Sequence, residues 1–221
     1  MCIDAKTSIT TFIIASILNC MVFTSTSNVN YLMMSGVYQF IIMIQLFDFM
    51  VWKDQKCGKL NKIGTRTIFT ATLLQPIVIA NIILLFSTVK GTYERLIVSL
   101  IIIIYTAFLF NKLYFSKNYK TVTCLKPTDE CSHLDYSWWK KPLNEDKVLN
   151  TGIAGILYST GILLSVLLLV KTFKFAAIHA VYIIVSGLLG NILYSCGEPS
   201  MWCLMATGGP LLNYILMKNN V

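Results

Sequence analysis

Charged residues are scarce in this sequence: only 13% of its 221 residues are Asp, Glu, Lys or Arg, while 56% are apolar. Soluble domains usually contain about 25% charged and about 45–50% apolar residues. The chain therefore has too little polar surface to cover a globule in water, and its apolar residues form runs too long for core helices. Intrinsic disorder requires the opposite balance and is excluded. The sequence predicts an integral membrane protein.

Histidine is also scarce, with two residues in the whole chain. Metal-dependent membrane hydrolases need several histidines, so that class lacks its ligands. A structural zinc site needs four ligands with gaps of about two to four residues. Six residues separate Cys124 from Cys131 and His133 follows, which leaves only Cys57 as a fourth ligand. The sequence also lacks a P-loop, a dinucleotide-binding motif and HExxH. We expect no enzyme activity, no cofactor and no metal.

Seven apolar segments are long enough to cross a bilayer as helices, which takes about 20 residues. The apolar runs that include Ile101–Ile104 and Leu167–Val170 contain no internal turn signals, which favours helices over buried strands. The seventh segment is short and carries Gly208, Gly209 and Pro210. We predict an all-α fold: a single integral membrane domain built as a seven-transmembrane-helix bundle, with a cytosolic or interfacial loop at 116–149. The predicted spans cover residues 8–26, 31–52, 67–88, 95–115, 150–170, 174–194 and 200–217.

The net charge of +8 lies in the loops between these spans, where membrane topology explains it better than nucleic-acid binding. With the N-terminus in the cytosol, 13 basic residues lie inside and 5 outside. This asymmetry predicts a cytosolic N-terminus and an outside or lumenal C-terminus; the membrane concerned and the oligomeric state stay open. The inside residues are Lys6, Lys53, Lys56, Lys59, Lys62, Arg66, Lys112, Lys117, Lys120, Lys126, Lys140, Lys141 and Lys147, and the outside ones are Lys90, Arg95, Lys171, Lys174 and Lys218.

Cysteine use follows from this orientation. Cys57, Cys124, Cys131 and Cys196 would all lie on the reducing side of the membrane. Disulfides are rare there, so we predict none of structural weight.

Two aromatic residues are followed directly by two basic ones in the long loop, at Trp138, Trp139, Lys140 and Lys141. Tryptophan beside lysine is typical of the headgroup layer, which predicts an interfacial anchor. The alternative is attraction to anionic lipid, worth about 1 kcal/mol per basic residue near the surface. The expected partners are thus the lipid bilayer and anionic lipid at the basic cytosolic loops.

Few polar residues lie inside the predicted spans, and such residues usually face a protein interior or a wet cavity. One reading is a polar cavity in which Asp48 serves as an ion or proton site. The other is interhelical hydrogen bonding, worth about 0.6–2 kcal/mol per contact. We expect Asp48 and His179 to be too far apart along the bilayer normal to pair, and Pro76 and Pro210 to be helix kinks. The cavity candidates are Asp48, Gln45, Gln75, Asn81, His179, Asn191 and Asn213.

Spans three and seven share a faint pattern. Residues 71–76 and 206–210 both begin with Ala-Thr and end in proline, and an asparagine follows at Asn81 and Asn213. The two spans lie four apart, which fits a 3+1+3 parallel repeat.

Three short patterns resemble an uncharacterised family of seven-span membrane proteins encoded mainly by large nucleocytoplasmic DNA viruses and some microbial eukaryotes. They are Cys57 with Asn61-Lys62, Gln75-Pro76 with Asn81, and Pro199-Ser200-Met201-Trp202-Cys203. The family carries an acidic residue followed by Gln in span two and a His before Gln-Pro in span three. This chain instead has Gln45 before Asp48, and Thr72 near the place of the His. The resemblance implies a viral or protist origin and lends no activity.

Two main function classes remain, and the sequence favours the first over the second. A small transporter, channel or seven-helix sensor requires the polar residues to converge on one cavity. A structural or interaction protein, such as a viral-envelope or organelle-membrane component, requires a packed bundle that acts through its basic loops. A membrane enzyme lacks a catalytic set.

Overall fold

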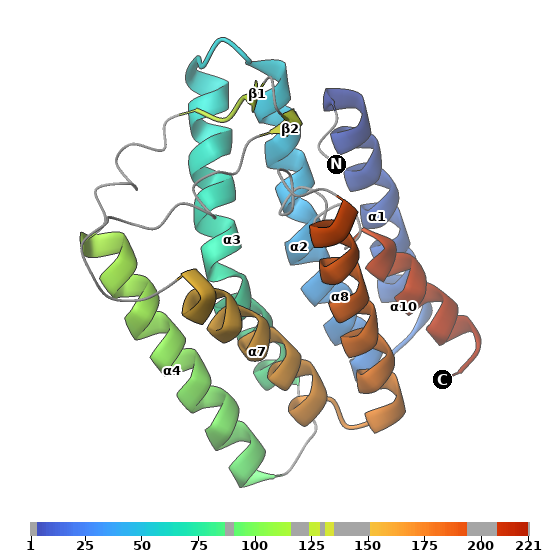
Figure 1. Cartoon of the computed structure of the whole chain (residues 1–221). Helices are drawn as coiled ribbons and strands as arrows, with labels where there is room; N and C mark the ends of the chain where they lie inside the picture. The colour runs from blue at the N-terminus through green and yellow to red at the C-terminus, as the bar shows by residue number, and fades with distance from the viewer. Residues whose placement is uncertain are drawn as a thin grey trace.

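The computed structural model describes residues 4–86, 91–115, 124–128, 131–134, 151–193 and 207–220. These residues form seven helices that alternate in direction, and one pair of short antiparallel strands (Figure 1). The all-α prediction is confirmed. The elements are α1 (Ala5–Ser25), α2 (Val29–Lys53), α3 (Lys59–Phe86), α4 (Thr92–Phe115), β1 (Pro127–Thr128), β2 (Cys131–Leu134), α7 (Thr151–Leu169), α8 (Phe173–Leu193) and α10 (Gly208–Lys218).

Three helices, α1, α2 and α3, are long and apolar enough to cross a membrane, which identifies a membrane protein. The first six predicted spans each coincide with a helix to within a few residues, except that α3 begins eight residues early, at Lys59. The seventh differs: α10 has 11 residues, and positions 200–206 lie outside the described residues. The anchor residues Trp138, Trp139, Lys140 and Lys141 also lie outside them.

Polar side chains fix where the first two helices begin. The Asp4 carboxylate accepts the backbone N–H of Thr7 at 2.6 Å, and the Asn28 side chain accepts the N–H of Asn30 at 3.0 Å. Both are N-caps that satisfy a donor left free by the first helical turn. The Asn28 cap and the extended backbone at Thr26 and Asn28 carry the chain from the end of α1 into α2.

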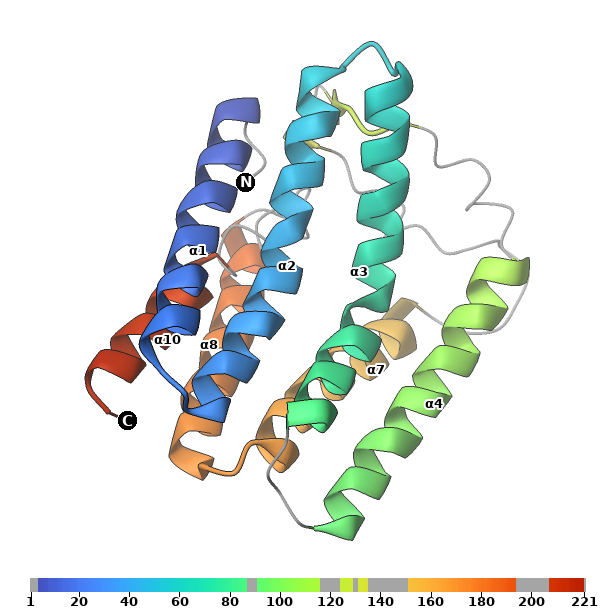
Figure 2. The same cartoon turned by 180° about the vertical axis from the view of Figure 1, so that it is seen from behind.

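Helix α2 is central in one half of the bundle, since it contacts α1, α3 and α10. Helix α7 has the same role in the other half and contacts α3, α4 and α8. Figure 2 shows this division, with α1 and α10 on one side of α2 and with α4 beyond α3. The α2–α3 turn, β1 and β2 lie together at one end of the bundle (Figure 1).

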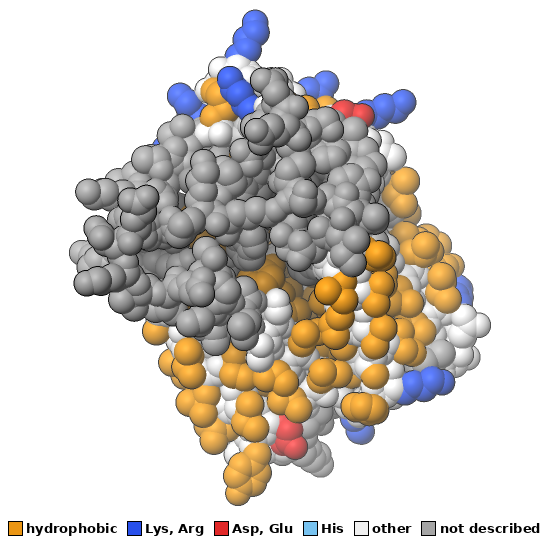
Figure 3. Space-filling model, viewed as in Figure 1, with side chains coloured by type: hydrophobic (Ala, Val, Ile, Leu, Met, Phe, Trp, Pro, Cys, Tyr) orange, Lys and Arg blue, Asp and Glu red, His pale blue; other side chains and the backbone are white. Residues whose placement is uncertain are grey.

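Large apolar side chains are exposed along the sides of several helices rather than buried. Hydrophobic side chains cover much of the described surface in Figure 3, while lysines and arginines lie at the ends. Such an apolar surface is what a lipid environment requires. Examples are Ile14 and Ile17 on α1, Leu96 and Ile103 on α4, Val181 and Leu188 on α8, and Leu211 and Ile215 on α10.

The two prolines occupy different places. Pro76 lies inside α3, where it has no N–H to donate to the carbonyl of Thr72. One residue on, the Leu73 carbonyl accepts the hydroxyl of Tyr105 from α4 at 2.8 Å. Pro210 lies in the first turn of α10, where a missing N–H costs little. It therefore stands at a helix start and not at a kink within a helix.

Candidate functional site

Five of the seven predicted cavity residues are fully buried, each with 0% exposure: Gln45, Asp48, Gln75, His179 and Asn213. Asn81 is instead exposed, and its amide donates to the Ile77 carbonyl of its own helix at 2.7 Å. Asn191 lies in α8, and its side chain is outside the described part of the structure. Asn81 is thus not part of a buried polar site.

Polar side chains of α1 and α2 form hydrogen bonds across the contact between these two helices. The amide of Asn19 donates to Gln39 at 3.0 Å, and the amide of Gln39 donates to Ser16 at 3.2 Å. Further along, Thr11 donates to Gln45 at 3.4 Å. Asp48 lies about one turn beyond Gln45 on α2 and is equally buried. Gln45 therefore contributes to the α1–α2 contact.

Gln75 joins α3 to α7. Its side-chain carbonyl accepts a hydrogen bond from the hydroxyl of Tyr158. Its amide nitrogen is buried and has no hydrogen-bond partner among the described residues. The residue next to it, Pro76, lies 3.5 Å from where a Cβ on Gly161 of α7 would stand. A small residue on α7 thus allows the close approach at which Gln75 and Tyr158 meet.

His179 joins α8 to α2. Its Nδ1 lies 2.7 Å from the Tyr38 hydroxyl, and the ring packs edge-on against Phe175 at 4.4 Å between centroids. The other ring nitrogen, Nε2, has no hydrogen-bond partner among the described residues. Tyr38 precedes Asp48 by ten residues, or about 15 Å along α2. His179 is thus bonded well away from the level of Asp48.

Asn213 joins α10 to α2. Its amide nitrogen donates to the Tyr31 carbonyl at 3.0 Å and to the Ser35 hydroxyl at 2.9 Å. Its side-chain oxygen has no hydrogen-bond partner among the described residues. The helices approach so closely here that a Cβ on Gly209 would stand 2.1 Å from the Tyr38 ring. A glycine at this position is a steric requirement.

Four of the predicted polar residues, Gln45, Gln75, His179 and Asn213, therefore bond across four different helix contacts, α1–α2, α3–α7, α2–α8 and α2–α10. The described residues also contain no group of three or more His, Cys, Asp or Glu that could hold a metal ion. Chemically, the arrangement holds helices together.

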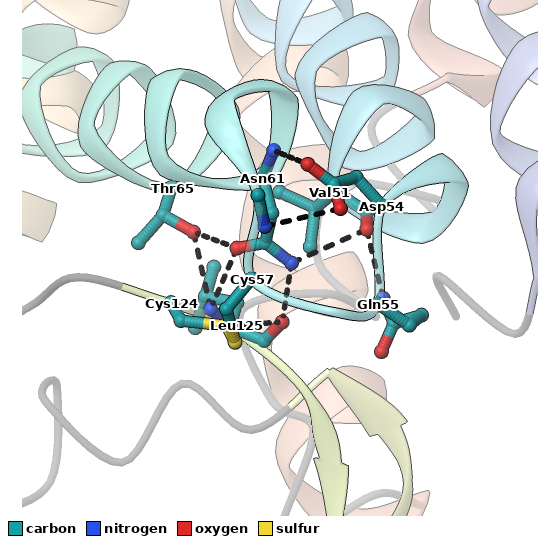
Figure 4. The surroundings of a disulfide bond; sticks show 9 residues. Val51, Asp54, Gln55, Cys57, Asn61, Thr65, Cys124 and Leu125 are labelled. Atoms are coloured by element: carbon teal, nitrogen blue, oxygen red, sulfur yellow. Dashed lines mark hydrogen bonds between the residues drawn. A yellow bond between two sulfur atoms is a disulfide. The ribbon is translucent and has the colours of Figure 1, made fainter.

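A second cluster of polar residues lies where α2 ends and α3 begins (Figure 4). The sequence analysis did not predict this cluster. Cys57 and Cys124 form a disulfide with their Cα atoms 5.5 Å apart, across 67 residues of sequence. The prediction of no disulfide of structural weight was therefore wrong. It rested on the compartment inferred from charge, whereas the bond depends on two loops that meet only in the folded chain. As disulfide partners, these two sulfurs are also unavailable to zinc.

Asn61, on the first turn of α3, is the hub of this centre (Figure 4). Its amide nitrogen donates to the carbonyls of Leu125 at 2.9 Å and Val51 at 3.3 Å. Its side-chain oxygen accepts the Leu125 N–H at 3.2 Å and the Thr65 hydroxyl at 3.0 Å. Asn61 is fully buried, so both polar ends of its amide are satisfied without water. We call the set Cys57, Asn61, Thr65, Cys124 and Leu125 the tip clasp.

The turn that carries Cys57 is built by Asp54. The Asp54 carboxylate accepts the backbone N–H groups of Gly58 and Asn61, each at 3.1 Å. These hydrogen bonds, that from Asn61 first, hold the pKa of Asp54 below its usual value. Cys57, in the turn between Asp54 and Gly58, has a φ of 59°, in the left-handed region that residues other than glycine seldom adopt.

Apolar side chains pack next to the tip clasp and help to hold it in place. Leu125 and Leu134 are 3% and 0% exposed and join a small core with Ile44, Val51 and Ile68 of α2 and α3. Leu125 and Leu134 thus pack their side chains against the end of the bundle where α2 ends and α3 begins. Sequence reasoning missed this because Asn61 and Thr65 occur in a polar, lysine-rich stretch that reads as an ordinary loop. The clue present was the pair of cysteines.

In comparisons with known proteins, no family model, no curated protein and no solved structure matches this chain.

Proposed function

We propose that this chain is a non-enzymatic, multi-pass membrane protein with a structural or interaction role. The supporting observation is that Gln45, Gln75, His179 and Asn213, all buried, bond across four different helix contacts. A transport site would instead gather such groups around one cavity, commonly where helices are broken. Interhelical bonds of this kind stabilise a bundle by about 0.6–2 kcal/mol each.

The proposed topology has seven spans, a cytosolic N-terminus and tip clasp, and a C-terminus outside or in a lumen. It rests on the 13 to 5 division of basic residues. The 3+1+3 repeat and the relation to the viral and microbial-eukaryote family stay predictions.

The proposed partner is anionic lipid on the face that carries the tip clasp. Lys56, Lys59 and Lys62 lie in and after the α2–α3 turn with exposed side chains. Basic residues at a membrane surface attract anionic headgroups by about 1 kcal/mol each. Three other exposed lysines lie away from this turn and serve as a matched control for it. They are Lys171, Lys174 and Lys218.

A second candidate is a transporter, channel or sensor. Three buried polar atoms favour it, since the described residues provide no hydrogen-bond partner for Gln75 Nε2, His179 Nε2 or Asn213 Oδ1. Buried donors and acceptors are normally satisfied, and a passing solute or water could bond to them. They belong to three different helix contacts, which is why this candidate stands second.

Flux and lipid assays on the purified full-length protein separate the two. We expect proteoliposomes with the wild type or Asp48→Asn to pass protons, potassium and chloride no faster than empty vesicles, with ionophores as positive controls. Solute flux by the wild type that Asp48→Asn abolishes would overturn the structural role.

Replacing Lys56, Lys59 and Lys62 by glutamine should weaken phosphatidylserine binding by about 1 kcal/mol per lysine. The same change at Lys171, Lys174 and Lys218 should have the smaller effect; an equal loss would contradict a lipid site at the tip.

A further inference from the structure

We propose that the Cys57–Cys124 disulfide is a thiol–disulfide exchange site whose reduction releases residues 124–128 and 131–134 from the junction between the end of α2 and the start of α3. The inference rests on the cytosolic sidedness proposed above. The proposed topology puts this end of the bundle in the cytosol, whereas in the structure a disulfide joins its loops. Disulfides found in the cytosol are usually transient, catalytic or redox-sensing. A reversible bond is compatible with both.

Access to the sulfurs supports exchange. Cys57 and Cys124 are both half-buried, in contrast to Asn61 and Thr65 beside them, which are buried. Exchange requires a thiolate to reach one sulfur, so partial exposure is a condition that the pair meets. Exposed lysines Lys56 and Lys126 lie next to Cys57 and two residues after Cys124 in the chain. Their positive charge favours both an approaching thiolate and a leaving one.

The backbone at Cys57 is a second, independent observation. Its φ of 59° is unfavourable for a residue with a Cβ, and glycine would adopt it freely. Strained residues persist where the surrounding structure holds them, and they cluster at switch regions. Here the Cys57 N–H donates to the Asp54 carbonyl at 3.2 Å, and the sulfur is tied to Cys124. Breaking the disulfide removes one of these two restraints.

The remainder of the tip clasp determines what reduction does. The Leu125 N–H is shared between Asn61 Oδ1 at 3.2 Å and Thr65 Oγ1 at 3.1 Å, and the Leu125 carbonyl accepts from Asn61. These bonds and the packing of Leu125 and Leu134 persist without the disulfide. They hold the segment non-covalently, in equilibrium with an open state. Reduction therefore converts a fixed attachment into a reversible one, while the helices stay packed.

The reductant is a cellular dithiol, such as a thioredoxin-type protein. Its thiolate attacks one sulfur of the pair, the Cys57–Cys124 bond breaks, and the other cysteine leaves as a thiolate and takes up a proton. The reductant's second thiolate then breaks the mixed disulfide and releases the second cysteine. The dithiol supplies two electrons and two protons and becomes a disulfide, and the protein gains two thiols.

The redox state is measured on the full-length protein in cells. Free thiols are trapped with acid and N-ethylmaleimide, disulfides are then reduced, and the new thiols are labelled with a polyethylene-glycol maleimide. We expect a mixture of oxidised and reduced pair that dithiothreitol and diamide shift in opposite directions within minutes. Cys20→Ser is the matched control because Cys20 is an exposed free cysteine. A pair that stays fully oxidised, or fully reduced, under all conditions would overturn the proposal.

Opening is measured by amide hydrogen exchange on the purified protein. Reduction should speed exchange in the peptide containing Leu125 at least tenfold and leave the peptide containing Ile41 and Ile42 unchanged. The variant Cys57→Ser with Cys124→Ser should show the fast exchange without reductant; reduced wild type provides the same test if that variant does not fold. Unchanged exchange at Leu125 would overturn the release step. A tag that reports the side of the N-terminus separates failure of this proposal from failure of the proposed topology.

Discussion

Replacing Gly209 by alanine is expected to destabilise the bundle by about 3 kcal/mol, near the upper end of the usual cost of overpacking. The added Cβ would lie 2.1 Å from Cε1 and 2.4 Å from Cδ1 of the Tyr38 ring. That ring is 1% exposed and its hydroxyl is bonded to His179, so it cannot rotate away. Helix α10 must shift instead, which weakens the bonds from Asn213 to Tyr31 and Ser35.

The midpoint of detergent-induced unfolding measures this loss. Gly36→Ala is the matched control, because its Cβ would meet Ile82 at an ordinary contact distance of 3.6 Å. Alanine is favoured over glycine within a helix by up to about 1 kcal/mol, so the Gly36 variant should be as stable as the wild type or more so. Equal midpoints for the two variants would show that α10 does not pack against Tyr38 in this way.

Replacing Asn61 by alanine is expected to cost about 2–3 kcal/mol, because it leaves buried groups without partners. The Leu125 carbonyl loses its donor, and the Thr65 hydroxyl loses its acceptor. The Val51 carbonyl suffers less, since it also accepts from Gln55 at 2.8 Å. The effect should be largest at the tip clasp, where exchange of the Leu125 amide is accelerated even with the disulfide intact.

Asn81→Ala is the matched control on the same helix. Asn81 is exposed and bonds only to Ile77 of its own α3 among the described contacts, so its loss should change stability by less than about 0.5 kcal/mol. Unfolding midpoints and exchange rates of the two variants are compared under identical detergent conditions. If Asn61→Ala matches Asn81→Ala in both measurements, the tip clasp does not depend on Asn61.

Helix positions could be predicted well because lipid leaves the backbone few choices. A segment such as 31–52 must satisfy its N–H and C=O groups internally, so apolar length alone locates α2 at Val29–Lys53. The start of α3 is less visible, since its first turns run through the polar residues Lys59 to Arg66. Hydropathy marks where lipid begins, whereas this helix extends beyond the apolar run to form the tip clasp.

The pairing of side chains could not be predicted in the same way. Gln45 was grouped with Asp48 because both lie on one face of α2, yet its bond is to Thr11 of α1. Which face meets which neighbour depends on the rotation and tilt of packed helices, which hydropathy does not encode. The disulfide pairing could not be predicted from the sequence either. Its cysteines lie 67 residues apart, and only the docking of Leu125 against Asn61 brings them together.

The central claim is that the buried polar side chains act as separate helix-to-helix links, and a set of double-mutant cycles tests it most directly. Ser35→Ala and Asn213→Ala remove two sides of the α2–α10 link, and Tyr158→Phe removes one side of the α3–α7 link. We predict a coupling of about 0.5–2 kcal/mol between Ser35 and Asn213, and additivity within about 0.5 kcal/mol between Asn213 and Tyr158. A coupling above about 1 kcal/mol between Asn213 and Tyr158 would contradict separate links and indicate one shared polar interior.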